Sequence, residues 1–113
     1  MDHIRQEKRA VFFAHDLQQN DLWQEQVLER LTDKVYLTVD LDVLDPSIMP
    51  AVGTPEPGGL LWFPVLDLIR RVAREKEIVG FDIVELSPLP GQVAPDFLAA
   101  RLAYKIIGYS LFP

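Results

Sequence analysis

The sequence contains no cysteine, which excludes disulfide bonds and thiolate metal sites. It has no apolar run of 18 residues, and its opening residues, MDHIRQEKR, do not look like a signal peptide. Lysine and arginine total only 11 against 17 acidic residues, and the net charge of −6 argues against a nucleic-acid-binding surface. We therefore expect a soluble cytoplasmic protein that binds neither nucleic acid nor membrane.

The 113 residues, 49% of them hydrophobic, suffice for one small domain with a modest core. The spacing of apolar residues predicts strands at 10–14, 34–40 and 78–84 and helices at 21–32, 63–75 and 94–107. Strands that alternate with helices indicate an α/β fold, with a parallel sheet and flanking helices. Three parallel strands buried on both faces leave long apolar edges, so we expect the chain to be part of a larger sheet.

Local signals predict the helix ends. Asn20 is the expected N-cap of the first helix, Pro64 suits the first turn of the second, and Gly108 is the expected stop of the third. The third helix carries little charge, so we expect it to be deeply buried or to face a partner. Four aromatic residues are assigned to the core: Phe12, Phe13, Trp23 and Phe97.

Two carboxylates stand at the end of the predicted strand 34–40. Asp40 and Asp42 are two residues apart, so in an extended chain they point to the same face. Glu85 follows the next predicted strand, and parallel strands have their carboxyl ends on the same side. We therefore expect these three acids to converge on one crevice, where like charges need a cation between them. A hard divalent metal ion is the simplest such cation.

The segment between the second strand and the second helix is rich in proline and glycine. Residues 44–60, LDPSIMPAVGTPEPGGL, contain four prolines and three glycines. This composition predicts an ordered, stiff loop rather than regular secondary structure. A long structured loop at the carboxyl end of a strand is where α/β proteins build their sites.

Three further polar residues are weaker candidates. We interpret His15 as an ordinary loop residue rather than a metal ligand, and His3 likewise. Asp82 lies inside a predicted strand, where we expect a structural role in which it pairs with a buried arginine or a backbone donor.

The strings YLTVDLDVLDPSIMPAVGTPEPGGL and IVGFDIVELSP, in that order, resemble the ureohydrolase family of arginases and agmatinases. The likeness runs from about residue 34 to the C-terminus, and GTPEPGG and VELSP look more like agmatinases than arginases proper. The resemblance implies a three-layer α/β/α fold, of which residues 1–113 are expected to be the C-terminal portion of the catalytic domain. It also leads us to expect a homo-oligomer.

The family's motifs assign roles to four residues. The resemblance implies a binuclear Mn²⁺ centre with Asp40 and Asp42 as metal ligands, Glu85 facing the substrate guanidinium and Thr54 near the substrate. Two metal ions bridging one water lower its pKa, and the resulting hydroxide attacks the guanidinium carbon to release urea and an amine. We expect agmatine as the substrate and putrescine as the product. The family also has an upstream histidine and a DxHxD motif, which this sequence lacks. We therefore expect the isolated chain to be inactive.

Two other interpretations remain open at this point. The string DLDVLD also resembles the nucleophile motif of haloacid-dehalogenase-type phosphatases, although the DP turn and the GTPEPGG loop that follow fit that motif poorly. The second alternative is a non-catalytic remnant that binds other subunits through a sheet edge and the helix 94–107. Turnover of a phosphoester favours the first alternative, and an oligomer without stoichiometric Mn²⁺ favours the second.

Overall fold

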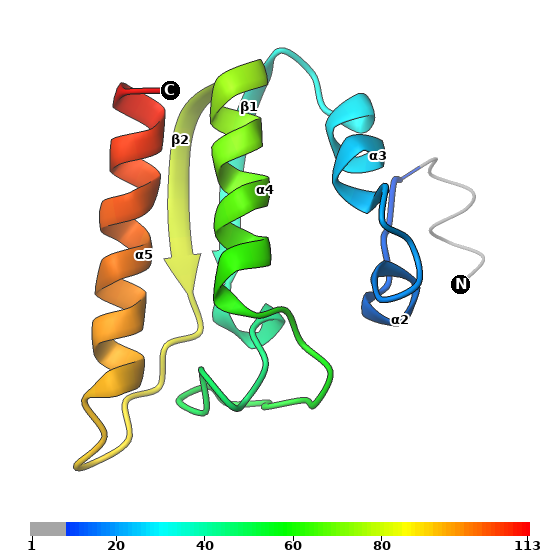
Figure 1. Cartoon of the computed structure of the whole chain (residues 1–113). Helices are drawn as coiled ribbons and strands as arrows, with labels where there is room; N and C mark the ends of the chain where they lie inside the picture. Colours follow the sequence, from blue (N-terminus) through cyan, green and yellow to red (C-terminus); the bar gives the residue numbers. More distant parts are fainter. Residues whose placement is uncertain (1–8) are drawn as a thin grey trace.

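The computed structural model describes residues 9–113. Figure 1 shows two strands side by side with two long helices packed against them and smaller helical segments to one side. The elements in chain order are α2 (Ala14–Leu17), α3 (Trp23–Arg30), β1 (Lys34–Asp40), a 3₁₀ turn (Leu41–Val43), α4 (Trp62–Glu75), β2 (Glu77–Val84) and α5 (Ala94–Leu111). The predicted α/β fold with a parallel sheet and flanking helices is confirmed.

Strands β1 and β2 pair in parallel, with Lys34 opposite Glu77 and Asp40 opposite Val84. A register shift after Val35 leaves Val79 as an extra residue on β2. Because α4 makes the crossover between the two strands, their carboxyl ends lie at the same edge of the sheet, as the sequence predicts.

The predicted strand at 10–14 is wrong. Residues 10–13 form no ladder, and α2 begins at Ala14. An extended apolar run becomes a strand only where a neighbouring strand pairs with its N–H and C=O groups, and within residues 9–113 no such neighbour is in place. The described sheet therefore has two strands rather than the three expected.

Two helix ends also differ from prediction. Helix α3 is shorter than the predicted 21–32, and the Asn20 side chain accepts the backbone N–H of Leu22 at 3.0 Å, within the turn before the helix. Helix α5 continues through Gly108 to Leu111. One interior glycine costs a helix about 1 kcal/mol. The packing of Ile106, which is fully buried two residues earlier, offsets that cost.

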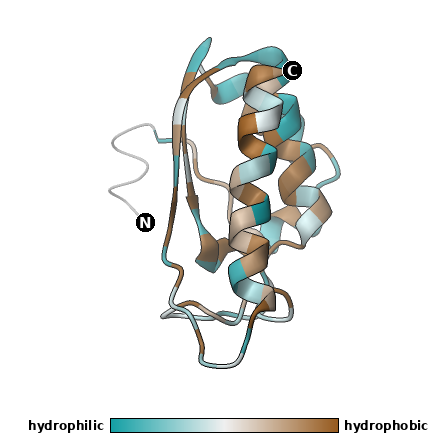
Figure 2. Cartoon of the chain, turned by 90° about the vertical axis from the view of Figure 1, so that its left-hand side faces the viewer, coloured by the Kyte–Doolittle hydropathy of each residue, from teal (hydrophilic) through white to brown (hydrophobic). Residues whose placement is uncertain are grey.

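The core lies between the sheet and the two long helices. Figure 2 shows α4 and α5 on the same side of the strands. The buried cluster draws on β1, the segment after it and both long helices; its members are Val39, Leu41, Leu44, Met49, Ala51, Val52, Val65, Leu66, Ile69, Ala99, Leu102 and Ile106. The segment that carries the candidate acids is thus anchored in the same core as the helices.

The opposite face of the sheet carries no helix in the described part of the chain. The prediction that the strands are buried on both faces is therefore wrong for the described chain. Tyr36 of β1, for example, is 60% exposed. Its hydroxyl donates to Asp82 Oδ2 at 3.0 Å, and Thr38 donates to the same oxygen at 3.4 Å. Asp82 thus pairs with hydroxyls rather than with an arginine or a backbone group. The hydrogen bond to Asp82, with a smaller contribution from burial, raises the pKa of Tyr36.

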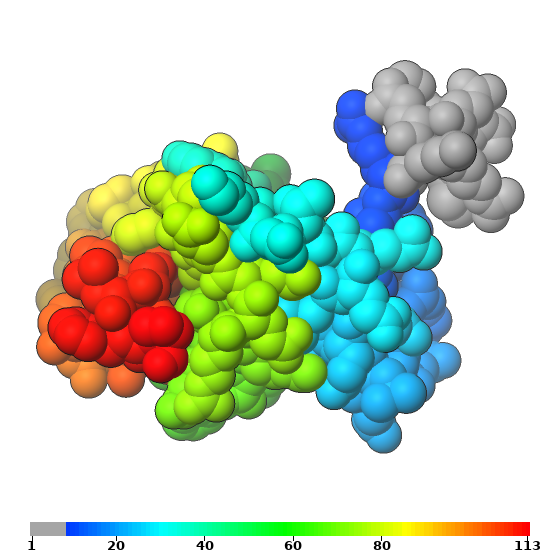
Figure 3. Space-filling model, turned by 90° about the horizontal axis from the view of Figure 1, so that it is seen from above, coloured from blue at the N-terminus to red at the C-terminus, as the bar shows by residue number. Residues whose placement is uncertain are grey.

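The predicted core aromatics divide into two groups. Phe12 and Trp23 are partly buried, but Phe13 and Phe97 are 50% and 65% exposed, so their assignment to the core is wrong. Phe97 lines an open hollow between α4 and α5 and stays accessible there, whereas Leu102 of α5 is fully buried. Seen from above, α3 lies beside α4 rather than over α5 (Figure 3). Within residues 9–113, no helix is long and apolar enough to cross a bilayer.

Asp45 holds the two ends of the 44–60 loop together. Its Oδ2 accepts the Ser47 hydroxyl and the Ser47 backbone N–H, the latter at 3.0 Å, and its Oδ1 accepts the Gly58 N–H at 3.1 Å. These bonds favour the carboxylate over the acid, and the Ser47 hydroxyl contributes most. They therefore lower the pKa of Asp45 below its ordinary value.

This shift predicts a pH-dependent effect of Asp45→Asn on stability. A carboxyl whose folded-state pKa is lowered contributes stability that is present above its unfolded value of about 3.9 and is lost as pH falls through the folded-state value. We expect the variant to unfold at lower urea concentration than wild type at pH 7 and to approach wild type as pH falls below that value. Asp67→Asn, at an exposed position on α4, is the control; an equal deficit for Asp45→Asn at all pH values would contradict the assignment.

Candidate metal and substrate site

The carboxyl edge of the sheet holds the acids that the sequence singles out. Asp40 ends β1 opposite Val84, and Glu85 follows directly after β2. The chain after Asp40 is not extended, as the prediction assumed, but turns at once into the 3₁₀ turn Leu41–Val43. Asp40 caps this turn, because its Oδ1 accepts the Asp42 backbone N–H at 2.9 Å. Leu41, fully buried between the two acids, anchors the turn in the core.

Asp42 has one oxygen with a hydrogen-bond partner and one without. Its Oδ2 accepts the hydroxyl of Thr54, a residue of the 44–60 loop. Its Oδ1 is buried and has no hydrogen-bond partner among residues 9–113. A buried carboxylate oxygen without a donor is costly, so its presence calls for an explanation. A cation bound by that oxygen is one, and a carboxylate is a ligand that suits Mn²⁺.

The 44–60 loop is ordered, as its composition predicts. The N–H of Leu60 donates to the carbonyl of Val43 at 2.8 Å, and the N–H of Asp45 donates to the carbonyl of Leu60 at 2.9 Å, which closes the loop at its base. A further bond from the Ser87 N–H to the Ala51 carbonyl, at 2.8 Å, ties the loop to the segment after β2. The loop thus connects the ends of both strands and carries Thr54 to Asp42.

Glu85 has an unusual backbone conformation. Its φ of 75° is the only positive value at a non-glycine residue in the described chain. Such a conformation costs about 1–3 kcal/mol and persists only where the surroundings impose it, typically at functional sites. Glu85 is exposed at the point where the chain leaves the sheet.

The part of the chain that the structure describes does not form the expected crevice of three converging acids as a metal site. Within residues 9–113, no group of three or more histidine, cysteine, aspartate or glutamate residues is placed to hold a metal ion. The expectation assumed an extended chain through Asp42, and the 3₁₀ turn replaces that geometry. His15 lies exposed in α2 rather than in a loop, and His3 falls outside the described residues. The assignment of Asp40 and Asp42 as ligands therefore stays a prediction.

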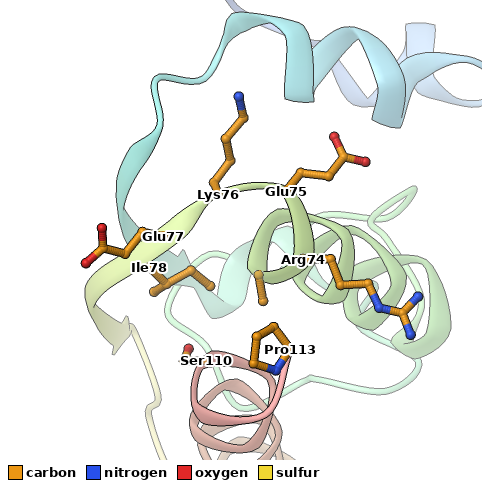
Figure 4. A pocket seen from close by; sticks show the side chains of 8 residues that line it. Arg74, Glu75, Lys76, Glu77, Ile78, Ser110 and Pro113 are labelled. Atoms are coloured by element: carbon orange, nitrogen blue, oxygen red, sulfur yellow. The ribbon is translucent and has the colours of Figure 1, made fainter.

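A cavity of about 380 Å³ lies at the opposite, amino end of β2 (Figure 4). Its lining includes charged residues from the end of α4 and the start of β2 together with the C-terminal Pro113. The side chains of Arg74, Lys76 and Glu77 point in different directions, so they offer no common position for a charged ligand group. Binding sites have a few convergent polar groups, and this cavity does not.

The fold and these residues define a parallel α/β protein with an acidic site where the strands end. A sequence model described as "Arginase family" matches residues 1–108, and the chain belongs to that family. The expected ureohydrolase resemblance is thereby confirmed.

Among curated relatives, the N(1)-aminopropylagmatine ureohydrolase of Synechocystis sp. is 45% identical over 109 residues, which cover 96% of this chain and 36% of the relative. The protein of the same name from Thermus thermophilus is 50% identical over 99 residues, which cover 88% of this chain and 33% of the relative. The chain thus spans about a third of the length of these relatives.

Solved structures agree with the fold. The proclavaminate amidino hydrolase of Streptomyces clavuligerus superposes with a TM-score of 0.87 and 32% identity, covering 97% of this chain and 39% of that one. The arginase of Bacillus caldovelox superposes with a TM-score of 0.82 and 28% identity, covering 95% and 38%. The arginase-like α/β fold is therefore shown.

Three features of the site were not predicted from sequence. The hydrogen bond from Thr54 to Asp42 and the left-handed backbone of Glu85 depend on the loop and on chain contacts far apart in sequence, and no local pattern announces them. The role of Asp45 has a local signal, because an aspartate two residues before a serine is typical of a turn in which its side chain accepts backbone N–H groups.

Proposed function

We propose that this chain carries part of the active site of a Mn²⁺-dependent ureohydrolase acting on a linear guanidino amine of the agmatine type. The observation that carries the proposal is Asp42: its Oδ1 is buried and no group in the described part of the chain donates to it, while the Thr54 hydroxyl donates to its Oδ2. Membership in the arginase family and the printed names of its relatives support the reaction class.

Asp40 and Asp42 are the proposed metal ligands. The Asp42 N–H occupies Oδ1 of Asp40 and leaves its Oδ2 for a metal ion, and the Thr54 hydroxyl orients Asp42 so that its Oδ1 is the free oxygen. When bound, a pair of Mn²⁺ ions supplies a water activated for attack at neutral pH. The fit is partial, because two carboxylates are too few to hold two ions and residues 9–113 offer no group of three or more such ligands.

Glu85 is the proposed partner of the substrate guanidinium. A carboxylate holds this planar cation through paired, charge-assisted hydrogen bonds. Glu85 is exposed, and its positive φ fixes the direction of the backbone where the chain leaves β2. Both features fit a side chain that binds a substrate cation. Thr54 is proposed to lie near the substrate, and its contact with Asp42 adds an orienting role for the metal ligand.

Two related compounds are the candidate substrates. Agmatine is the choice from sequence, and the agmatinase of Pyrococcus horikoshii is 36% identical over 84 residues. The Synechocystis and Thermus relatives, which are 45% and 50% identical, are named for N(1)-aminopropylagmatine. We therefore propose N(1)-aminopropylagmatine as the first substrate and agmatine as the second. A cytoplasmic location and a homo-oligomer also remain part of the proposal.

The test uses a chimera in which this chain replaces the matched 109-residue region of the Synechocystis relative. We expect the purified chimera to release urea from N(1)-aminopropylagmatine when Mn²⁺ is present. The isolated chain is expected to release none, because its residues 9–113 hold no complete metal site. Urea is measured colorimetrically, with the unaltered relative as the positive control.

Two outcomes contradict the proposal. A chimera that folds and binds Mn²⁺ but releases no urea from either compound removes the assigned reaction. Urea release by the isolated chain shows instead that the missing groups are not needed.

A further inference from the structure

Helix α5, which stands at one edge of the molecule, carries two apolar stripes (Figure 1). The inner stripe belongs to the core, and Leu102 and Ile106 on it are fully buried. The outer stripe is displaced from the inner one by two positions, which places it about 200° around the helix. Its members are Val93, Phe97, Ala100, Tyr104, Ile107 and Leu111. All of them are exposed, and Tyr104 and Leu111 are each 67% exposed.

The outer stripe has the spacing of a coiled-coil contact. Its members are alternately four and three residues apart, a pattern that repeats every seven residues and fits a second helix with the same pattern. In heptad notation Phe97, Tyr104 and Leu111 occupy a positions, and the other three members occupy d positions. A short isolated coiled coil must also pay for forming its helices, but α5 is already folded against α4 and β2. A second copy of α5 is therefore a complementary occupant for this stripe.

Two charged residues flank the outer stripe on opposite sides. Asp96 occupies a g position and Arg101 occupies the e position five residues later. In a parallel pair of helices, a g residue lies beside the e residue five positions further along the other helix. Asp96 therefore meets Arg101 of the partner subunit, and two-fold symmetry makes the same contact a second time. The Arg101 guanidinium carbon lies 5.5 Å from the centre of its own Tyr104 ring, which holds it at the edge of the stripe.

The same charges disfavour the antiparallel arrangement. There a and d positions face each other, so Ala100 meets Tyr104 of the partner subunit, and e positions meet e positions. Arg101 then faces Arg101 of the partner subunit, and like charges across an interface are unfavourable. The net charge of −6 opposes any self-association, but α5 itself has one acid and two bases, so the acidic excess lies on other elements.

We propose that this chain self-associates through the outer stripe of α5 as a parallel two-fold pair, with Asp96 of each copy beside Arg101 of the partner subunit. The proposal gives the homo-oligomer a surface and an orientation. It does not rest on the proposed reaction, so molecular mass and urea release test the two separately.

The first experiment measures the molecular mass of the purified chain by sedimentation equilibrium over a wide range of concentration. We expect an equilibrium of monomer and dimer. Tyr104→Glu should weaken the dimer by roughly tenfold or more, because it places two charges in the middle of a desolvated contact. Leu22→Glu, at an apolar residue that is 61% exposed beside α3, is the matched control and should associate as wild type does. A wild-type chain that stays monomeric overturns the proposal, as does wild-type affinity in a Tyr104→Glu variant that keeps its helices by circular dichroism.

A charge exchange tests the parallel orientation. Asp96→Arg alone places bases against bases and Arg101→Asp alone places acids against acids, so each variant should self-associate several-fold more weakly than wild type. A mixture of the two variants should associate as wild type does, because every contact in the mixed pair again joins an acid to a base. A mixture that associates no more tightly than the separate variants overturns the parallel arrangement.

A cross-linking measurement covers the case in which other exposed apolar surfaces also cause association. The chain has no cysteine, so Ala100→Cys introduces a single thiol. In the parallel pair d positions face each other, and oxidised glutathione should convert the two thiols to a disulfide that links two copies. Leu22→Cys is the control and should stay unlinked at the same protein concentration. Equal yields of linked dimer from the two variants overturn the proposal.

Discussion

Replacing Gly59 by alanine is expected to cost the chain about 3 kcal/mol of its free energy of unfolding. An ideal Cβ at this position would lie 2.5 Å from the Asp45 nitrogen, 2.6 Å from the Leu44 carbonyl carbon and 2.7 Å from the Val43 oxygen. All three atoms are backbone and cannot rotate away, so the loop must separate from the strand end. The hydrogen bonds that join Leu60 to Val43 and Asp45 are made at this crossing and should weaken with it.

The matched control for this prediction is Gly53→Ala in the same loop. An added Cβ at Gly53 meets no atom within 4 Å, and its backbone is not in the left-handed region. We expect its effect to stay within about 0.5 kcal/mol of wild type, or to be slightly stabilising. Urea denaturation followed by circular dichroism compares the two variants. Equal stability of both would show that the close approach of the loop to the strand end does not occur.

Asp42→Asn in the chimera is expected to reduce urea release and Mn²⁺ affinity by more than about 100-fold. Removing a group that only hydrogen-bonds to a metal ligand usually costs about 10–100-fold, and removing the ligand itself should cost more. Asparagine keeps an oxygen that can accept the Thr54 hydroxyl, but it removes the negative charge that a metal ion requires. The free energy of unfolding without metal should not fall, because Oδ1 of Asp42 has no hydrogen-bond partner within the described residues. Metal affinity is measured by calorimetric titration and stability by urea denaturation.

Thr54→Val gives a graded companion to this experiment. Valine has nearly the shape of threonine but cannot donate to Asp42 Oδ2, so the ligand loses its orientation and keeps its charge. We expect a loss in Mn²⁺ affinity of about 10–100-fold, smaller than for Asp42→Asn. Asp67→Asn, at an exposed position on α4, is the control. Unchanged metal affinity in Asp42→Asn would remove this residue from the metal shell.

Predictions from sequence succeeded for helices and strands whose apolar residues are buried in the spacing that the sequence shows. The apolar stripe of α4 at Val65, Leu66, Ile69, Val72 and Ala73 is buried as its helical spacing predicts. Both predicted strands that end in acids exist, with boundaries within one residue.

Predictions from sequence failed where the structure of a segment depends on contacts with another segment of the chain. The run 10–14 has the composition of a strand but no pairing partner in the described chain, and Phe97 has the character of a core residue but lies in an open hollow, 65% exposed. At Gly108, packing of the helix outweighs the local stop signal.

For the candidate site, the amino-acid sequence by itself determined which groups are present: the acids at 40, 42 and 85, the loop that follows the first two, and the family to which the motifs belong. Only the tertiary structure decided how those groups are held. It replaced the extended run through Asp42 by a 3₁₀ turn, brought Thr54 onto that carboxylate, put Glu85 in a left-handed conformation and left one face of the sheet bare. The physical reason is that residue type sets which bonds and conformations are available. Contacts between segments far apart in sequence, here the closure of the loop on the strand end, select among them.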